Sequence, residues 1–133
     1  MPASLRLELF PSDMKRFVEF YVDILGFVIR KQEGTYIFVQ RDEIFIGAIE
    51  VPNNDSLTEK ESYRRPTKGV ELVFEVDDLV AERDAIVEHG WQLTDDIKMQ
   101  EWGLEDFRLV DPDGYYVRIT TKSPKRDSEG AAL

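Results

Sequence analysis

The hydrophobic positions of the chain first alternate and then recur at helical spacing. Residues 5–10 place leucines at every second position against charged side chains, which predicts a strand. The segment PSD at residues 11–13 then opens a helix, with Ser12 as the expected N-cap. Apolar residues over positions 14–25 form one helical stripe, and Gly26 is a natural C-cap. The pattern therefore predicts a strand followed by an amphipathic helix.

Short apolar runs separated by turn residues come next. Residues 27–30 begin a second strand, and the pair EG at residues 33–34 predicts a turn. Residues 36–40 form a third strand. The pair RD at residues 41–42 turns the chain into a fourth strand over residues 44–51.

Residues 52–68 change character. The segment PNNDSLTEKESYRRPTK is polar, contains two prolines and shows no lasting periodicity. It is predicted to be a long loop or linker, and its length suits a connection between modules or a flap over a site.

The order of patterns then repeats. Residues 70–76 predict a strand. Asp77 or Asp78 is expected to cap a helix that runs to about His89 and ends at Gly90. The buried face of this helix is expected to consist of its larger apolar residues, Leu79, Val80, Ile86 and Val87.

Three further strands and a tail complete the pattern. A strand is expected at residues 91–93, reaching as far as residue 97, and another at residues 107–110. The segment DPDG at residues 111–114 is a strong hairpin turn, because proline and glycine set its backbone angles. The last strand covers residues 115–121, and the polar segment 123–133 is expected to be a disordered tail.

The repeated order predicts an α+β fold made of two βαβββ modules. Module one covers residues 4–51, the linker residues 52–68 and module two residues 69–122, within a single domain over residues 1–122. Each helix ends at a glycine followed by an aromatic residue. One such module would expose the apolar face of its sheet, whereas two modules can cover each other, within one chain or across a dimer.

Composition narrows the class of partner. The formal charge of −10 argues against nucleic acid, because phosphate binding needs a basic face. The same charge attracts cationic small molecules, although solubility alone also explains it. The chain has no cysteine, no long apolar run and no signal-peptide pattern in its first residues. A cytoplasmic protein that does not engage a membrane is therefore expected.

Two motifs carry a family resemblance. The segment FVEFYVDILGF (17–27) resembles the first-helix signature of the vicinal oxygen chelate superfamily, which includes glyoxalases, bleomycin-resistance proteins and dioxygenases. The segment EWGLEDFRLVDPDGYYVRI (101–119) resembles its closing hairpin and is most similar to bleomycin-resistance proteins. The resemblance covers residues 5–121. It implies that each module curls its sheet into a half-barrel around a cleft, and that the protein is a homodimer.

Many members of that superfamily hold a divalent metal through His and Glu side chains on the first and last strands of each module. The corresponding positions here are Arg6, Ile46 (or its neighbour Gly47), Glu71 and Arg118. Only one of them is a carboxylate, and an arginine does not deprotonate to bind a metal. Two fixed positive charges would also repel the cation. The resemblance therefore implies a protein without a metal or another cofactor.

The same positions are candidates for ligand binding. The resemblance implies that Arg6, Glu71 and Arg118 converge in the cleft. Glu71 would then accept from one or both arginines in a salt bridge, or one arginine would bind an anionic or carbonyl group of a ligand. Trp102 is a further candidate, because it lies in a loop-like acidic segment that suits a flat cationic ligand. Phe45, on a predicted strand, completes the set of ligand-binding residues.

Binding is favoured over catalysis, and two enzymatic alternatives stay open. The leading hypothesis is a metal-free protein that sequesters a small ligand, such as a cationic aromatic antibiotic. A metal-dependent lyase or ring-cleaving dioxygenase would need Glu50, Glu71 and Glu75 around one cleft. A metal-free enzyme would use Glu71 as a base, with Arg6 or Arg118 polarising a carbonyl. The single histidine, at the end of a predicted helix, argues against a Ser–His–Asp triad.

Overall fold

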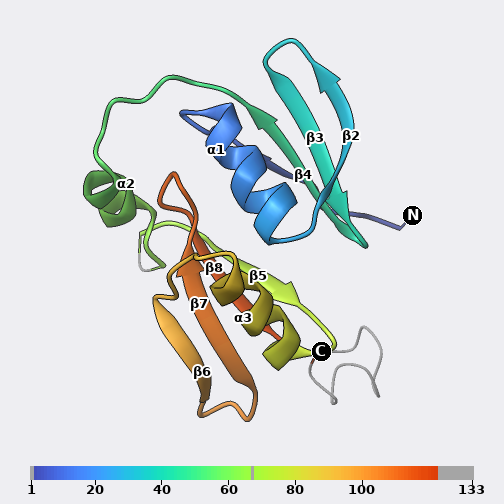
Figure 1. Ribbon diagram of the computed structural model, residues 1–133, viewed down its shortest axis with the longest axis vertical. Coiled ribbons are helices and arrows are strands. Elements are labelled where there is room, and N and C mark those ends of the chain that lie inside the picture. Colours follow the sequence, from blue (N-terminus) through green and yellow to red (C-terminus); the bar gives the residue numbers. More distant parts are fainter. Residues whose placement is uncertain (1, 67, 123–133) are drawn as a thin grey trace. The chain divides into compact units, whose positions relative to one another are not determined.

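The structure is a computed structural model that describes residues 2–66 and 68–122 (Figure 1). It contains two four-stranded sheets, each of mixed direction and each built from a βαβββ-like module, which confirms the α+β fold class. In chain order the elements are β1 Leu7–Leu9, α1 Met14–Val18, η1 Glu19–Ile24, β2 Val28–Glu33, β3 Tyr36–Arg41, β4 Ile44–Ile49, α2 Leu57–Arg64, β5 Glu71–Glu75, α3 Leu79–Glu88, β6 Asp95–Met99, β7 Glu105–Val110 and β8 Tyr116–Thr120.

The chain forms two compact units. The first unit contains the residues up to Ser62 together with Asp111–Gly114, and the second contains Tyr63–Val110 together with the described residues from Tyr115 onward. The turn between β7 and β8 therefore belongs to the first unit by its contacts, while the two strands belong to the second. The single domain predicted over residues 1–122 stays a prediction. The predicted tail at residues 123–133 lies outside the described residues.

The sheet of the first unit has the strand order β1-β4-β3-β2, with β1 parallel to β4. Successive side chains of a strand point to opposite faces of the sheet. The side chains on one face are buried in the core. The opposite face is only partly covered, and we call it the first open face. Its side chains include Glu8, Tyr36, Phe38 and Phe45. The core combines the buried sheet residues with those of the helix: Leu9, Phe17, Phe20, Tyr21, Ile37, Val39, Ile46 and Ala48.

The N-cap of the first helix is Asp13, one residue later than the Ser12 predicted from the sequence. The carboxylate of Asp13, rather than Ser12, accepts from the backbone N–H groups of Lys15 and Arg16 at 3.0 and 3.4 Å. Ser12 instead donates its hydroxyl to Asp113 at 2.7 Å. The helix widens into the π-helical turn η1 and ends before Gly26, whose φ of 79° confirms the expected C-cap.

The linker is not a loop throughout, which corrects the sequence interpretation. It contains helix α2, which is capped by a reciprocal pair: the Glu59 N–H donates to the Ser56 hydroxyl at 3.1 Å, and the Ser56 N–H donates to the Glu59 carboxylate at 3.2 Å. Lys60 of this helix is buried and donates to Asp113 at 2.9 Å and to Ser12 at 3.0 Å. The spacing S-x-x-E at residues 56–59 was a signal for this helix that the sequence interpretation did not use.

The sheet of the second unit repeats the topology, with the order β5-β8-β7-β6 and β5 parallel to β8. Its buried face packs with Leu79 and Ile86 of α3. Val80 and Val87 were expected in that core but are 57% and 46% exposed, because they lie on the other side of the helix. The strand expected from residue 91 begins only at Asp95. In the part of the chain that the structure describes, no helix has the length and apolar character needed to cross a membrane.

Candidate functional site

A cluster of four charged side chains lies on the less buried face of the second sheet, which we call the second open face. Glu71 comes from β5, Asp106 and Arg108 from β7, and Arg118 from β8. The side chains alternate with the buried residues of the same strands, so strand periodicity directs them to this face. Arg108 Nε donates to Glu71 Oε2 at 3.0 Å, and Arg118 Nε lies 3.5 Å from Glu71 Oε1. Glu71 therefore faces two arginines.

Asp106 is the most deeply buried member of this cluster, with its side chain 1% exposed. Its Oδ1 accepts from the Gln100 amide at 2.8 Å and lies 3.6 Å from Arg108 Nη1. Its Oδ2 lies 3.9 Å from Arg118 Nη1, beyond hydrogen-bond distance. Asp106 Oδ2 and Arg118 Nε are buried atoms without a hydrogen-bond partner. Two carboxylates and two guanidiniums balance in formal charge, but one acceptor and one donor are left unsatisfied.

Trp102 lies beside this cluster, in the turn between β6 and β7. The guanidinium carbon of Arg118 is 5.4 Å from the centre of the Trp102 ring, which is cation–π distance. The tryptophan is nevertheless 53% exposed. Gly103, with a φ of 90°, allows the backbone to turn immediately after it. The second unit therefore brings together three of the residues expected from the sequence, Glu71, Arg118 and Trp102.

The other two predicted residues, Arg6 and Phe45, both contact Phe38 on the first open face. The rings of Phe38 and Phe45 stack with centroids 6.2 Å apart and planes inclined by 19°. The guanidinium carbon of Arg6 lies 6.0 Å from the Phe38 centroid, and its Nε lies 3.7 Å from Glu8 Oε2. The predicted meeting of Arg6 with Glu71 and Arg118 concerns residues of different units and stays a prediction.

Sequence reasoning missed several members of both clusters. It named Arg6 and Arg118 as partners of Glu71, whereas the hydrogen bond to Glu71 comes from Arg108. The signal for Arg108 was present, because Asp106 and Arg108 alternate with two apolar residues in a predicted strand. Glu8 carried the same signal in its own strand, between Leu7 and Leu9.

The positions compared with metal ligands in the sequence do not fit a divalent cation. Ile46 is fully buried in the core, so Gly47, the direct neighbour of Glu8 across the sheet, is the residue on the open face. Glu50 accepts from the Met14 N–H at 2.7 Å and so satisfies the start of a helix. Glu71 already faces two guanidiniums. Within residues 2–66 and 68–122, no three His, Cys, Asp or Glu residues are grouped to hold a metal.

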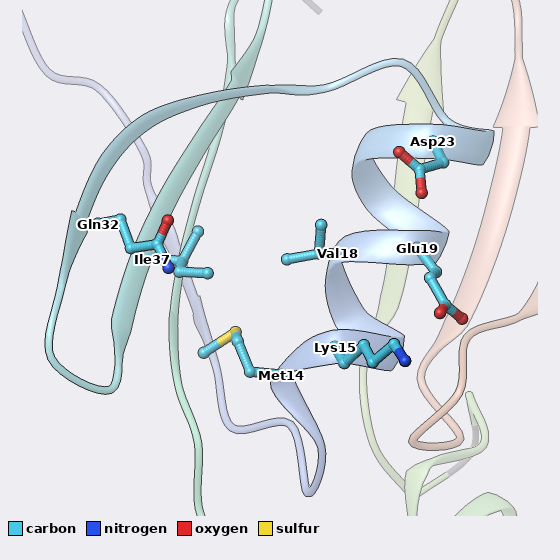
Figure 2. Close-up of a pocket in the computed structure, with 7 residues that line it drawn as sticks. All are labelled: Met14, Lys15, Val18, Glu19, Asp23, Gln32 and Ile37. Atoms are coloured by element: carbon cyan, nitrogen blue, oxygen red, sulfur yellow. The ribbon is translucent and has the colours of Figure 1, made fainter.

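A separate hollow of about 450 Å³ lies on the helix side of the first unit (Figure 2). Figure 2 shows Met14 and Val18 pointing from the helix toward Ile37 of β3, so the centre of the hollow is apolar. None of the five residues predicted to bind a ligand lines it. The hollow is bordered by Met14, Lys15, Val18, Glu19, Asp23, Gln32 and Ile37.

Comparisons with known proteins agree with this fold. A family model described as the Glyoxalase/Bleomycin resistance protein/Dioxygenase superfamily matches residues 4–119. A bleomycin resistance determinant encoded on the transposon Tn5 is 22% identical, with a TM-score of 0.73, over 92% of this chain and 99% of that chain. A bleomycin-binding protein complexed with bleomycin is also 22% identical, with a TM-score of 0.71, over 92% and 100%.

A protein of unknown function from Agrobacterium tumefaciens str. C58 is 24% identical, with a TM-score of 0.67, over 92% of this chain and 96% of that chain. At such identities the similarity shows a shared fold, and function has to be argued from the site. A search of the curated proteins found no match.

Proposed function

Because the chain belongs to the glyoxalase/bleomycin resistance protein/dioxygenase superfamily, we propose that it binds a small, flat aromatic ligand on the open faces of its sheets. The superfamily contains resistance proteins as well as enzymes, so membership alone does not decide between binding and catalysis. The observation that supports binding is the exposed Trp102 ring held against Arg118 beside a charge-balanced cluster.

The second open face offers an aromatic ring, that of Trp102, on which a ligand can stack. Arg118 is directed by β8, and its guanidinium lies at cation–π distance from the Trp102 ring. An aromatic ligand that stacks on the indole would gain contact area, because Trp102 is 53% exposed. Arg118 Nε and Asp106 Oδ2 are buried and have no hydrogen-bond partner, so a ligand group would reach them only if the Trp102 side chain moved.

The first open face offers a second aromatic surface. Phe38 and Phe45 stack on each other, and both are only half-buried. Arg6 lies near one of these rings and Glu8 near Arg6. Rings flanked by charges are typical of sites for aromatic ligands with a charged group.

The overall charge favours a cationic ligand. A net charge of −10 raises the local concentration of cations near the protein and lowers that of anions. The bleomycin-binding protein with the same fold was solved with bleomycin, which makes glycopeptide antibiotics sensible first probes. Sequestration of such a ligand requires no reaction and no metal.

The metal-free enzymatic alternative has less support. Proton abstraction by Glu71 needs a carboxylate oxygen that can reach the substrate. Its two oxygens lie 3.0 Å from Arg108 Nε and 3.5 Å from Arg118 Nε. A base held between two guanidiniums would have to leave them before it could act.

The proposal is tested with a thermal-shift panel that contains bleomycin and benzamidine. Both are expected to raise the melting temperature of the wild-type protein, because a ligand that binds only the folded state stabilises it. Trp102→Ala should abolish the shift with bleomycin, while Val80→Ala, an exposed substitution on α3, should preserve it. The absence of a shift with every aromatic compound would overturn the proposal, and an equal shift in Trp102→Ala would remove Trp102 from the site.

We also propose a homodimer in the cytoplasm. Paired half-barrels of this fold can complete their clefts across a two-fold axis. Sedimentation of the wild-type protein should then give a species of twice the chain mass of 15.5 kDa. A monomer at all concentrations would contradict the dimer without affecting ligand binding.

A further inference from the structure

We propose that Glu8, Tyr36 and Phe38 form a subsite for an organic cation on the first open face, and that the guanidinium of Arg6 fills this subsite until the cation displaces it. This inference rests on the proposed binding function. It names the residues that would bind an organic cation and assigns Arg6 the role of an internal competitor rather than a ligand-binding residue.

Gly47 allows the Glu8 carboxylate and the Tyr36 hydroxyl to approach each other closely. Glu8, Gly47 and Phe38 lie side by side on β1, β4 and β3 as direct neighbours in the sheet. A methyl group at position 47 would overlap the Glu8 carboxylate and would lie 2.8 Å from the Tyr36 hydroxyl. The Glu8 carboxylate on β1 and the Tyr36 hydroxyl on β3 therefore lie above Gly47 of β4, where a side chain at position 47 would otherwise be.

The side chains around Gly47 are of the types that bind organic cations, namely a carboxylate and aromatic rings. Tyr36 and Phe38 are two residues apart on β3 and so share one face of the sheet. Phe45 extends the aromatic surface by stacking on Phe38. A carboxylate beside aromatic rings attracts amidinium, guanidinium and quaternary ammonium groups through charge and cation–π contact. An anion would be repelled by Glu8.

Arg6 already places a cation there, and holds it loosely. Its Nε lies 3.7 Å from Glu8 Oε2, and its guanidinium carbon lies 6.0 Å from the Phe38 centroid. The Arg6 side chain is 59% exposed and the Glu8 side chain 38%. The separation of 3.7 Å is beyond hydrogen-bond distance. Exposed ion pairs of this kind contribute little, so a ligand cation that also stacks on the rings can replace the arginine.

The experiment compares three probes of nearly identical shape on the full-length protein: benzamidine, which is a cation, benzamide, which is neutral, and benzoate, which is an anion. Isothermal titration or NMR titration gives their affinities. The wild-type protein should prefer benzamidine to benzamide, and benzoate should bind most weakly. Arg6→Gln should tighten benzamidine binding by about three- to ten-fold, because it removes the competing cation, and should leave benzamide unchanged.

Two further variants separate the subsite from overall charge. Arg16→Gln removes the same charge from an exposed position on the first helix, so it should tighten benzamidine binding far less than Arg6→Gln. Glu8→Gln should abolish the preference for benzamidine over benzamide. Both positions are exposed, so circular dichroism should show an intact fold in each variant.

The possible results lead to different conclusions. Weaker benzamidine binding in Arg6→Gln, or an effect equal to that of Arg16→Gln, would overturn the displacement of Arg6. If bleomycin then still raised the melting temperature in a Trp102-dependent manner, the proposed function would stand without this subsite. If none of the three probes and no aromatic compound bound, both the function and the subsite would be wrong.

Discussion

Arg108 and Arg118 are direct neighbours across the antiparallel strands β7 and β8, on the same face of the sheet. Like charges in this position repel each other and destabilise a strand pair. The carboxylate of Glu71 faces both guanidiniums, which turns a repulsive pair into a stable arrangement. Glu71, the position on β5 that was compared with a metal ligand, therefore has a structural role, because its negative charge offsets the repulsion between the two arginines.

Glu71→Gln should destabilise the protein by about 1–3 kcal/mol, because it leaves two partly buried guanidiniums without their shared carboxylate. Urea denaturation measures this change. Glu105→Gln, an exposed substitution on the same sheet, is the matched control and should change stability by less than about 0.5 kcal/mol. Equal stability of both variants would show that Glu71 does not compensate the arginine pair.

Lys60→Met should lower the free energy of unfolding by about 3–5 kcal/mol, because it leaves the Asp113 carboxylate buried without its cation. The side chains of Lys60 and Asp113 are 7% and 6% exposed. In a double-mutant cycle, Lys60→Met combined with Asp113→Asn should cost clearly less than the sum of the single substitutions. Strict additivity would contradict a direct interaction between the two charges.

Ser56→Ala should destabilise helix α2 by about 1 kcal/mol, since the serine hydroxyl accepts from the Glu59 N–H at the first turn. Hydrogen exchange of the α2 amides reports this change locally. Thr58→Ala, an exposed substitution in the same turn, should have a much smaller effect. Unchanged exchange rates in Ser56→Ala would show that the cap does not stabilise the helix.

The exposed pair of Arg83 and Asp96 predicts a pH-dependent term in stability. The hydrogen bonds from the Arg83 guanidinium, and then the backbone N–H of Ile97, lower the pKa of Asp96 below its ordinary value of 3.8. An acid with a lowered pKa stabilises the fold above its unfolded-state pKa, and this contribution disappears as the pH falls through the folded-state pKa.

Asp96→Asn should therefore be less stable than the wild-type protein at neutral pH, and the difference should shrink below pH of about 4. Chemical denaturation between neutral pH and acid measures it. Because the Asp96 side chain is 57% exposed and the Arg83 side chain 35%, added salt should reduce the effect. Asp95→Asn, an adjacent exposed substitution, is the matched control for the loss of one surface carboxylate.

Local periodicity was sufficient to predict most strands, the first and third helices and the turn residues. It failed where a distant contact decides the outcome. Ser12 did not serve as the N-cap because it bonds with Asp113, and no local pattern reveals a partner 101 residues away. Val80 and Val87 were misplaced because apolar character was taken for burial, although they lie on the far side of α3.

The sequence indicated several residues of the candidate site but not which of them bond to each other. Glu71, Arg118 and Trp102 do lie together in the second unit. Arg108 was missed because its strand was interpreted mainly as part of a motif, although alternation directed its side chain to the same face. Which of several nearby cations bonds to a carboxylate depends on strand register, and a register is set by pairing across the sheet.

The assignment of the turn Asp111–Gly114 to the first unit has a consequence for synthesis of the protein. The buried Tyr21 hydroxyl donates to Asp111 at 2.8 Å, and the buried Lys60 ammonium donates to Asp113 at 2.9 Å. A nascent chain that has emerged only to Ser62 lacks both acceptors. The N-terminal half therefore cannot reach its final packing on the ribosome before the closing hairpin is translated, and a fragment cut after the first module should not be a stable protein.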